Sequence, residues 1–394
     1  MRALFLAGTA LALLAASPAA AAWDDWSLSP LDGMVGDLSY SVGGQVQGSV
    51  FDTYQPAPSD NWGGTGAAQL NASLQRDYDS GLSLGLKGTF SLFHDHLSGD
   101  NYGSDLLAKL YGVMQTGLGR VEIGMSDGAA YQLAVTGPTV NGEVSLDNPN
   151  ATFFRDPSTG GAVIDVFALN SAVESSLNYA KISYFTPRLF GVQIGLSYTP
   201  SEGKDVLPFV NNGPNILNRQ KSLWEGAISY SDSFGPITLR TSAGFTVGHG
   251  DRKTASHAGL TDWALGAEAD WDIDDDTRLA IGGAYREANS YTFDINSAFT
   301  TGATRSLHLS SVLTRGSWSF GGEFGHGIAD GALGAPSLGV HAYELDAAYQ
   351  VNSNLQLSGG WQRQIYTRDS GTFYNGATHR LGMHAVFLHA VVNI

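Results

Sequence analysis

Residues 81–95 read GLSLGLKGTFSLFHD, and apolar and polar side chains alternate along this stretch one by one. The apolar positions that share one side are Leu82, Leu84, Leu86, Phe90 and Leu92. The polar positions on the opposite side are Ser83, Lys87, Thr89, Ser91 and Asp95. A side-chain period of two is that of a β-strand. The stretch therefore predicts a strand with one apolar face and one polar face.

The same alternation recurs from residue 38 to the end of the chain. It is clear in 192–198 and 237–247, whereas 106–114 is apolar on both sides. Clusters of Gly, Asp, Asn, Pro and Ser separate sixteen such segments, which we predict to be strands. Their ranges are 38–54, 65–79, 81–95, 104–117, 120–128, 175–186, 190–200, 222–233, 236–248, 259–272, 276–289, 303–314, 316–327, 339–351, 354–366 and 377–394.

The links between these segments alternate between short and long. Asp79-Ser80-Gly81 and Gly235-Pro236 are short, whereas about 20 residues follow Tyr198 and well over 40 follow Gly128. An even number of antiparallel strands with tight turns at one end and long loops at the other is the plan of an outer-membrane barrel. The pattern predicts an all-β transmembrane antiparallel β-barrel of 16 strands, with short periplasmic turns and long extracellular loops.

The start of the chain has the pattern of an export signal. One arginine is followed by a long apolar run and then by small residues. We expect residues 1–22 to be a cleaved signal peptide, 23–37 an N-terminal periplasmic segment, and 38–394 the barrel domain. Nothing later in the chain reaches the roughly 18 uninterrupted apolar residues that a transmembrane helix needs.

Composition narrows the possible partners. The formal net charge is −16, although only 15% of the residues are charged. Nucleic acid is excluded as a partner because its phosphates bind basic surfaces, and a weak preference for cations is expected instead. The chain has no Cys, so an exported protein gains no disulfides here. Its stability must come from backbone pairing and packing.

Two tryptophans help to separate a membrane barrel from a soluble sheet. Trp263 and Trp271 lie on one side of a predicted strand, eight residues apart. At about 3.3 Å per residue and a tilt near 40°, this spacing is roughly 20 Å of height. Outer-membrane barrels carry an apolar band about 25 Å tall between two aromatic girdles. The spacing favours the membrane barrel.

A membrane barrel of this size must be closed and hollow. In hydrocarbon, an open edge would leave backbone N–H and C=O groups unpaired, at a cost of several kcal/mol each. We therefore expect the last strand to pair with the first. Sixteen strands enclose a lumen too wide for side chains to fill. The expected function is a water-filled channel for the passive diffusion of small hydrophilic solutes and ions.

The longest link, residues 129–174, is a candidate constriction loop, because long irregular segments in compact proteins are usually functional. Folded inward, its acidic side chains would face basic side chains of the wall and create a transverse field across the pore. The acidic candidates are Glu143, Asp147, Asp156, Asp165 and Glu174. The basic candidates on the wall are Lys87, Lys109, Lys181 and Arg380.

The chain resembles the trimeric general-diffusion porins of Gram-negative bacteria, in particular their alphaproteobacterial branch. The resemblance rests on the export signal, the sixteen alternating segments, the longest loop after the fifth strand, and the stretch SDGAAYQLAVTGP at 126–138. It covers essentially the whole chain after the signal. It implies a homotrimer in the lipid of the outer membrane, a third loop folded into each pore, and an acidic and basic constriction.

The C-terminus departs from the pattern of that family. Such chains usually end in Phe, whereas this chain ends in Ile394. The apolar positions Val386 and Leu388 are also out of phase with Leu381 and Met383. This conflict predicts a β-bulge in the last strand.

Three other functions compete with an open channel. An outer-membrane enzyme would need a catalytic pair, and no Ser and His spacing singles one out. A substrate-selective channel, for example for sugars or small charged nutrients, would need an aromatic track, for which Phe153 and Phe167 are candidates. A soluble adhesin is the third. We predict no enzyme activity, no catalytic residues, no cofactor and no metal site.

Overall fold

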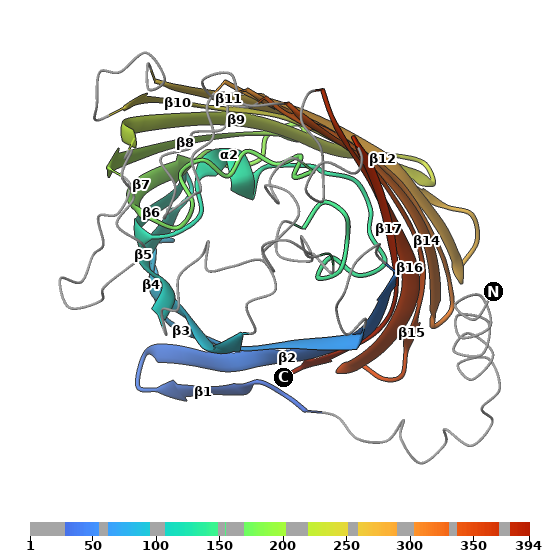
Figure 1. Ribbon diagram of the computed structural model, residues 1–394. Helices are drawn as coiled ribbons and strands as arrows, with labels where there is room; N and C mark the ends of the chain where they lie inside the picture. Colours follow the sequence, from blue (N-terminus) through green and yellow to red (C-terminus); the bar gives the residue numbers. More distant parts are fainter. Residues whose placement is uncertain are drawn as a thin grey trace.

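The alternating segments fold as β-strands in the computed structural model of the chain (Figure 1). The structure describes residues 28–54, 62–94, 107–148, 154, 169–201, 220–250, 259–289, 303–330, 337–369 and 379–394. Within these ranges, no helix is long and apolar enough to cross a membrane.

The described residues contain seventeen strands and one helical turn. The strands are β1 (Leu31–Val35), β2 (Leu38–Tyr54), β3 (Trp62–Asp77), β4 (Ser83–His94), β5 (Leu107–Thr116), β6 (Gly119–Met125), β7 (Ala180–Phe185), β8 (Val192–Ser201), β9 (Gln220–Phe234), β10 (Ile237–Gly250), β11 (Leu260–Asp272), β12 (Thr277–Ala288), β13 (Thr304–Arg315), β14 (Trp318–Ala329), β15 (Leu338–Gln350), β16 (Leu355–Arg368) and β17 (Arg380–Asn393). The helical turn is α2 (Ala129–Gln132).

Sixteen strands, β2 to β17, form a closed antiparallel barrel, as predicted. The closing seam joins β17 to β2, from His384 opposite Tyr54 to Asn393 opposite Gln45. At its end, the N–H groups of Gly44 and Ile394 donate to each other's carbonyl oxygens at 3.0 and 2.8 Å. Closure leaves no open sheet edge, which is what a hydrocarbon environment requires.

The extra strand β1 lies within the segment expected to precede the barrel. It pairs with the first residues of β2, from Leu31 opposite Val42 to Val35 opposite Leu38. The side chain of Asn354, in the turn between β15 and β16, exchanges hydrogen bonds with the backbone of Leu28 at 2.9 and 2.6 Å. These contacts fix the segment at the short-turn rim of the barrel.

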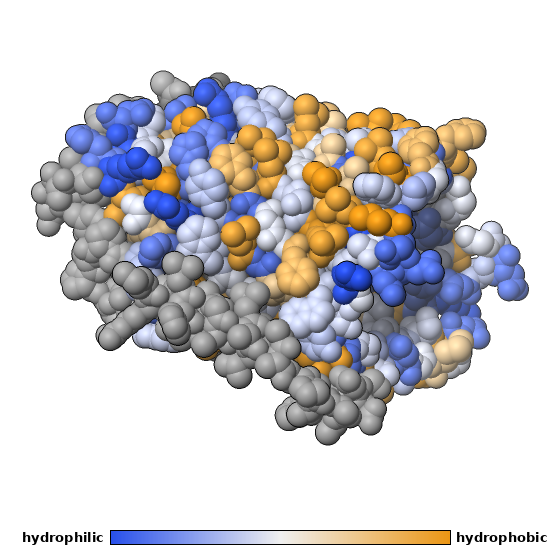
Figure 2. Space-filling view, turned by 90° about the vertical axis from the view of Figure 1, so that its right-hand side faces the viewer, coloured by the Kyte–Doolittle hydropathy of each residue, from blue (hydrophilic) through white to orange (hydrophobic). Residues whose placement is uncertain are grey.

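The outer face of the wall is apolar, as period-two alternation in a membrane barrel requires. Leu265, Leu309 and Leu345 all point outward and are about half exposed. Figure 2 shows apolar side chains gathered across this face, with hydrophilic side chains beside them.

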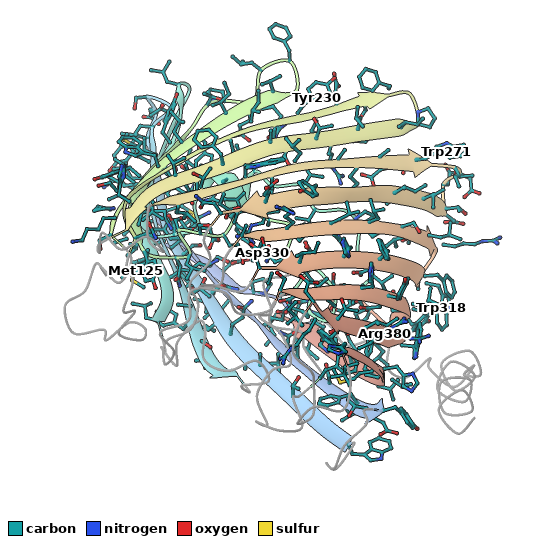
Figure 3. The ribbon with its side chains drawn as sticks, turned by 45° about the horizontal axis from the view of Figure 1, so that its top comes forward. Met125, Tyr230, Trp271, Trp318, Asp330 and Arg380 are labelled. Atoms are coloured by element: carbon teal, nitrogen blue, oxygen red, sulfur yellow. The ribbon has the colours of Figure 1, made fainter. Side chains whose placement is uncertain are left out.

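Trp271 and Trp318 lie at the short-turn ends of their strands (Figure 3), opposite the long-loop side. Trp263 packs against Tyr285 toward the long-loop ends of β11 and β12, with ring centroids 5.5 Å apart. Aromatic side chains therefore flank the apolar band toward both ends of these strands, as predicted.

The apolar core lies between the inner wall and the segment that links β6 to β7. Leu381 and Met383 of β17 are almost fully buried there and belong to one cluster with Val144 and Leu146 of that segment. The pairing of β16 with β17 continues without a register shift from Leu355 to Thr367. The predicted bulge in the last strand is therefore wrong. Leu381 and Met383 are apolar because they support the loop, and they face inward.

Candidate pore constriction

The long loop lies inside the barrel, as predicted, and follows the inner wall (Figure 1). It starts at α2, where the N–H of Ala129 donates to Ser197 Oγ of β8 at 2.8 Å. The N–H of Val135 donates to Ser242 Oγ of β10 at 2.8 Å. Asn141 Nδ2 then donates to Ser358 Oγ of β16 at 3.0 Å. The loop thus crosses the inner face from β8 to β16 and covers that side of the wall.

The loop then turns back toward β7. Asp147 Oδ1 accepts a hydrogen bond from the N–H of Ser171 at 2.7 Å, which joins its outgoing and returning arms. Ser306 Oγ of β13 donates to the carbonyl of Asn170 at 2.6 Å. The whole link runs from residue 126 to residue 179, because β6 ends at Met125 and β7 starts at Ala180. It is longer than the predicted 129–174, because β6 ends three residues earlier and β7 begins five residues later than the predicted strands 120–128 and 175–186.

Two glycines permit the close approach of loop and wall. A Cβ atom on Gly266 of β11 would lie 1.6 Å from the carbonyl oxygen of Val135. A Cβ atom on Gly128 would lie 1.7 Å from Glu225 Oε2 of β9. A side chain at position 266 would displace the backbone of the loop, and one at position 128 would displace the buried Glu225 side chain. Glycine on the wall and in the loop therefore permits their contact.

Lys181 joins the two ends of the loop. Its ammonium group is buried and donates to the carbonyl of Ser126 at 2.5 Å, to that of Ser176 at 3.3 Å, and to that of Leu177. The first of these residues begins the loop and the other two end it. Alternation placed Lys181 correctly on the inner side of the strand, but the loop covers its charge. Lys181 thus holds together the first and last residues of the loop, Ser126 and Ser176 to Leu177, which we call its neck.

Lys109 and Arg120 also point inward, and each is paired with a carboxylate. Lys109 Nζ lies 2.6 Å from Asp127 Oδ2, and Arg120 Nε lies 3.0 Å from Glu122 Oε1. Both cations are about one third exposed, so part of each charge still faces the lumen. The pairing reduces the net positive charge that this part of the wall presents.

Lys87 has a different environment from the other lysines. It is an exposed side chain on the inner face of β4, between Ser73 of β3 and Tyr111 of β5 in the register. Within the described part of the chain, no ion pair involves it. β3 and β4 lie across the lumen from the loop (Figure 1). Lys87 is thus a cation that faces the acidic loop from the opposite wall.

The structure corrects the predicted position of Arg380. Alternation predicts a lumen position for it, on the side of the strand opposite the apolar Leu381 and Met383. Those two side chains are buried under the loop, and Arg380 is exposed on the outer face of β17. It lies opposite Thr367, which is also exposed on the outside. The prediction of a lumen position for Arg380 is wrong.

The described acidic candidates of the loop are Glu143, Asp147 and Glu174, all half-buried. Glu143 Oε2 accepts from Gln47 Nε2 of β2 at 3.0 Å. Glu174 Oε2 accepts from Asn170 Nδ2 at 3.1 Å, and it also accepts from the Tyr131 hydroxyl. Burial, and then the charge of Glu174, raise the pKa of Tyr131, so this hydroxyl stays a donor. Asp156 and Asp165 lie outside the described residues.

A charged ladder on the inner wall was missed by the sequence reading. Arg240 of β10 lies 2.5 Å from Glu268 Oε1 and 2.9 Å from Asp270 Oδ2. Arg278 of β12 reaches the other oxygen of Asp270 at 2.6 Å. The signal was present in the sequence, because these four residues occupy polar positions of three consecutive strands. What the sequence lacked was the register that brings them together.

A second missed feature is a group of carboxylates beneath the loop. Glu323 of β14 lies directly opposite Glu344 of β15, and Gly321 lies opposite Asp346. Glu323 Oε2 accepts from Ser145 Oγ of the loop at 2.8 Å and lies 3.1 Å from His308 Nε2. Both oxygens of Asp346 have no hydrogen-bond partner among the described residues. Within those residues, no group has the arrangement of a metal site.

A comparison with models of protein families shows which family the chain belongs to. The model described as "Gram-negative porin" matches residues 7–387. The chain belongs to the Gram-negative porin family. This porin is accordingly a protein of the cell outer membrane, with short periplasmic turns and long extracellular loops.

Two curated relatives match half of this porin. They are uncharacterized proteins of Rickettsia conorii, 23% identical over 242 residues, and of Rickettsia typhi, 22% identical over 244 residues. Each match covers 54% of this chain and 52% of the relative. The chain therefore spans about half the length of the curated relatives it matches.

Solved structures similar to this porin share its fold. OmpT of Vibrio cholerae with loop L8 deleted has a TM-score of 0.56 at 11% identity, covering 91% of this chain and 100% of that one. In-vitro folded OmpT in its trimer form has a TM-score of 0.54 at 11% identity, covering 91% and 99%. The anion-selective porin from Comamonas acidovorans has a TM-score of 0.52 at 14% identity, covering 91% and 100%.

Proposed function

We propose that this porin forms a water-filled channel for the passive diffusion of small hydrophilic solutes and ions. One observation carries the proposal: a closed wall of sixteen strands is apolar outside and polar inside, and the described part of the link between β6 and β7 lies along its inner face. A barrel of this strand number encloses an aqueous channel. Solutes would move down their own gradients, so no cofactor or energy source is needed.

The constriction would lie between the loop and the wall formed by β3 and β4. Glu143, Asp147 and Glu174 of the loop supply the acidic side, and the sequence adds Asp156 and Asp165 to it. Lys87 supplies a basic group on the opposite wall, with Lys109 beside it in part neutralised by Asp127. Charges of opposite sign across a narrow passage produce a transverse field that orients dipolar solutes and disfavours apolar ones.

A weak cation preference follows from the balance of these charges. Lys109, Arg120 and Arg240 each lie beside a carboxylate, which cancels most of their charge. The hydrogen bonds of Glu143 and Asp147 come from an amide group and a backbone N–H. Such neutral donors leave the negative charge in place. The chain as a whole carries −16, which also concentrates cations at its surface.

We also propose that three copies of the chain assemble as a homotrimer. Support comes from the fold that this porin shares with OmpT, whose structure is described in a trimer form. Light scattering of the detergent-solubilised protein should give the mass of three copies. A mass of one copy at all protein concentrations would reject the trimer.

Reconstitution in a planar lipid bilayer tests the channel. We expect large stepwise conductances, in groups of three if the trimer is correct, and a reversal potential in a potassium chloride gradient that favours potassium. Block by one particular sugar or charged nutrient at low concentration would favour a substrate-selective channel instead. Hydrolysis of lipid without any conductance steps would indicate a barrel enzyme and reject the proposal.

A further inference from the structure

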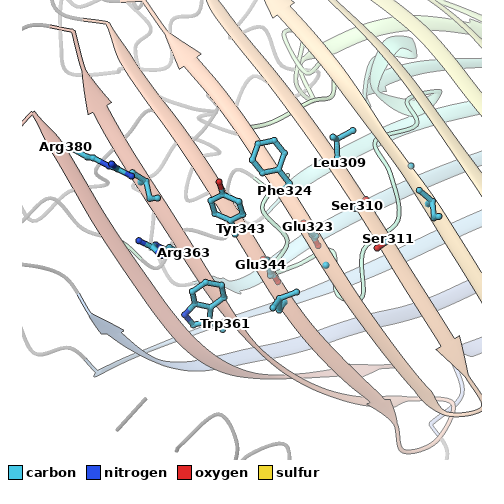
Figure 4. A pocket seen from close by; sticks show the side chains of 15 residues that line it. Leu309, Ser310, Ser311, Glu323, Phe324, Tyr343, Glu344, Trp361, Arg363 and Arg380 are labelled. Carbon is cyan, nitrogen blue, oxygen red and sulfur yellow. The ribbon is translucent and has the colours of Figure 1, made fainter. Parts of the chain in front are cut away.

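The inner face of β3 to β5 carries little charge. No Asp, Glu or Arg occurs in the stretches of these strands at 69–75, 83–91 and 109–115. Lys87 and Lys109 are the two cations of these stretches. Carboxylates occupy other parts of the inner wall, and Glu323 and Glu344, for example, lie side by side on β14 and β15 (Figure 4). The face of β3 to β5 therefore offers positive charge without a carboxylate of its own.

Lys87 lies at the centre of this face, among neutral polar side chains. In the register it is opposite Ser73 of β3 and Tyr111 of β5. Residues two positions along a strand point to the same side, and diagonal neighbours on the next strand lie about 7 to 8 Å away. The hydroxyl and amide side chains around Lys87 are accordingly Asn71, Ser73, Gln75, Thr89 and Tyr111. Thr89 Oγ1 donates to Asn71 Oδ1 at 2.9 Å, which holds this amide beside the lysine.

The two lysines of this face differ in how their charge is compensated. Lys109 lies opposite Thr89, but its ammonium group lies 2.6 Å from Asp127 Oδ2. Lys87 is exposed, and no ion pair among the described residues involves it. Its neighbours on this face are hydroxyls and amides, which donate and accept hydrogen bonds but carry no charge. One positive charge thus lies within a neutral surface that can form several hydrogen bonds.

We propose that Lys87 and the hydroxyl and amide groups around it bind a sugar acid, a solute with one carboxylate and several hydroxyls, as it passes through the pore. The inference rests on the proposed function and names a class of solute for it. The Lys87 ammonium group donates to the solute carboxylate in a charge-assisted hydrogen bond. The amides of Asn71 and Gln75, both exposed, donate to and accept from its hydroxyls. The ring of Tyr111 offers an apolar face to its C–H groups.

Both features of the solute are needed to use this face. A simple carboxylate such as acetate would leave the amides bonded to water, and a neutral sugar would leave the charge of Lys87 without a counterpart. A solute with two carboxylates would bring one charge more than the face can pair. The binding is weak, because a transported solute must also leave its site. A weak site raises the local concentration of the solute and keeps the path open to ions.

Single-channel recording of the full-length porin in a planar bilayer tests this site. Sodium gluconate, glucose or sodium acetate is added at one fixed concentration of potassium chloride, and the excess current noise gives the apparent dissociation constant of each solute. Saturation-transfer NMR of the detergent-solubilised porin measures the same binding without conduction. The variants are Lys87→Gln, Asn71→Leu and the control Arg315→Gln, which removes a positive charge on the outside of the barrel at the short-turn end of β13. Heat-dependent mobility on a gel verifies that each variant is folded.

We expect gluconate to bind the unchanged porin and Arg315→Gln about tenfold more tightly than glucose or acetate, as a hydrogen bond to a charged group predicts. Lys87→Gln should lower the affinity for gluconate to that for glucose. Asn71→Leu should weaken the binding of gluconate and of glucose about threefold, the size of a hydrogen bond between neutral groups, and leave that of acetate unchanged.

Equal affinities for gluconate and acetate in the unchanged porin would overturn the inference, and so would an affinity for gluconate that Lys87→Gln does not change. Conductance steps in potassium chloride would persist in either case, so the channel itself would stand. Conversely, gluconate binding by NMR that depends on Lys87, in a protein without conductance steps, would support the site and reject the proposed function.

Discussion

Lys87 is the side chain that we expect to have the largest influence on ion selectivity. It is exposed on the inner face of β4, a strand that lies across the lumen from the described part of the loop. Replacing it by Glu removes the positive side of the transverse field and adds a negative charge to the passage. The Lys87→Glu variant should show a stronger preference for potassium over chloride, measured as the reversal potential in a salt gradient across a planar bilayer.

The control for this experiment is Arg315→Glu, which makes the same change of charge on the outside of the barrel. Its reversal potential should equal that of the unchanged porin. An equal shift in both variants would mean that net charge, and not position in the lumen, sets selectivity. Arg380 illustrates why position matters, since it lies on the outer face of β17 although alternation predicts a lumen position.

Lys181 is expected to stabilise the folded protein through its hydrogen bonds at the neck of the loop. The Lys181→Met substitution would leave the buried carbonyls of Ser126 and Ser176 without their donor. Each unsatisfied buried group costs about 1 to 3 kcal/mol, so we expect a loss of roughly 3 kcal/mol or more in the free energy of unfolding. Denaturant unfolding followed by tryptophan fluorescence measures it.

Lys87→Met is the matched comparison for stability, because that lysine is exposed and has no ion pair within the described residues. It should unfold at nearly the same denaturant concentration as the unchanged porin. If Lys181→Met did so too, the hydrogen bonds at the neck would contribute little, and another contact would have to hold the loop.

At the scale of elements, the residues of the inner wall match the parts of the loop that pack against them. The inner face of β11 offers Gly266 where the carbonyl of Val135 passes, and the inner face of β17 offers Leu381 and Met383 where Val144 and Leu146 pack. Small residues admit the backbone of the loop, and apolar residues replace water beneath it. These contacts hold the described parts of the loop against the wall.

Gly266→Ala should therefore displace the loop. Its new methyl group would overlap the carbonyl oxygen of Val135, and overpacking of this kind costs about 1 to 3 kcal/mol. We expect a larger single-channel conductance with more frequent fluctuations, recorded in a planar bilayer. Gly382→Ala is the control, because a Cβ atom on Gly382 meets nothing within 4 Å. Identical conductance traces for the two variants would show that the loop does not depend on Gly266.

At the scale of the whole molecule, the proposed selectivity is electrostatic and should respond to salt. The Debye length falls from about 10 Å at 0.1 M to about 3 Å at 1 M ionic strength. Charges that face each other across an aqueous lumen are screened over such distances. The preference for potassium should weaken as the salt concentration rises from 0.1 M to 1 M, as measured by reversal potentials at a constant concentration ratio. A preference independent of salt would indicate selection by direct coordination of the ion.

The strands and the closed barrel could be predicted from the sequence because their cause is local. A segment such as 38–54 alternates along its own length, and the predicted range coincides with β2. An export signal and alternating link lengths place the strands in a membrane, and unpaired backbone groups in hydrocarbon then force closure. For Lys87 alternation alone predicts the inner side of its strand, and within the described residues its side chain is exposed.

Only the tertiary structure decided which polar side chains remain in the lumen. Lys181 faces inward, yet the loop buries its charge, and the carboxylates of Glu323 and Glu344 meet only because β14 and β15 pair in one register. Arg380 was assigned to the wrong face because Leu381 and Met383 look like lipid-facing residues. The physical reason is the same in each case: a loop folded against the inner wall creates an apolar environment there, and hydropathy along the chain does not distinguish that environment from lipid.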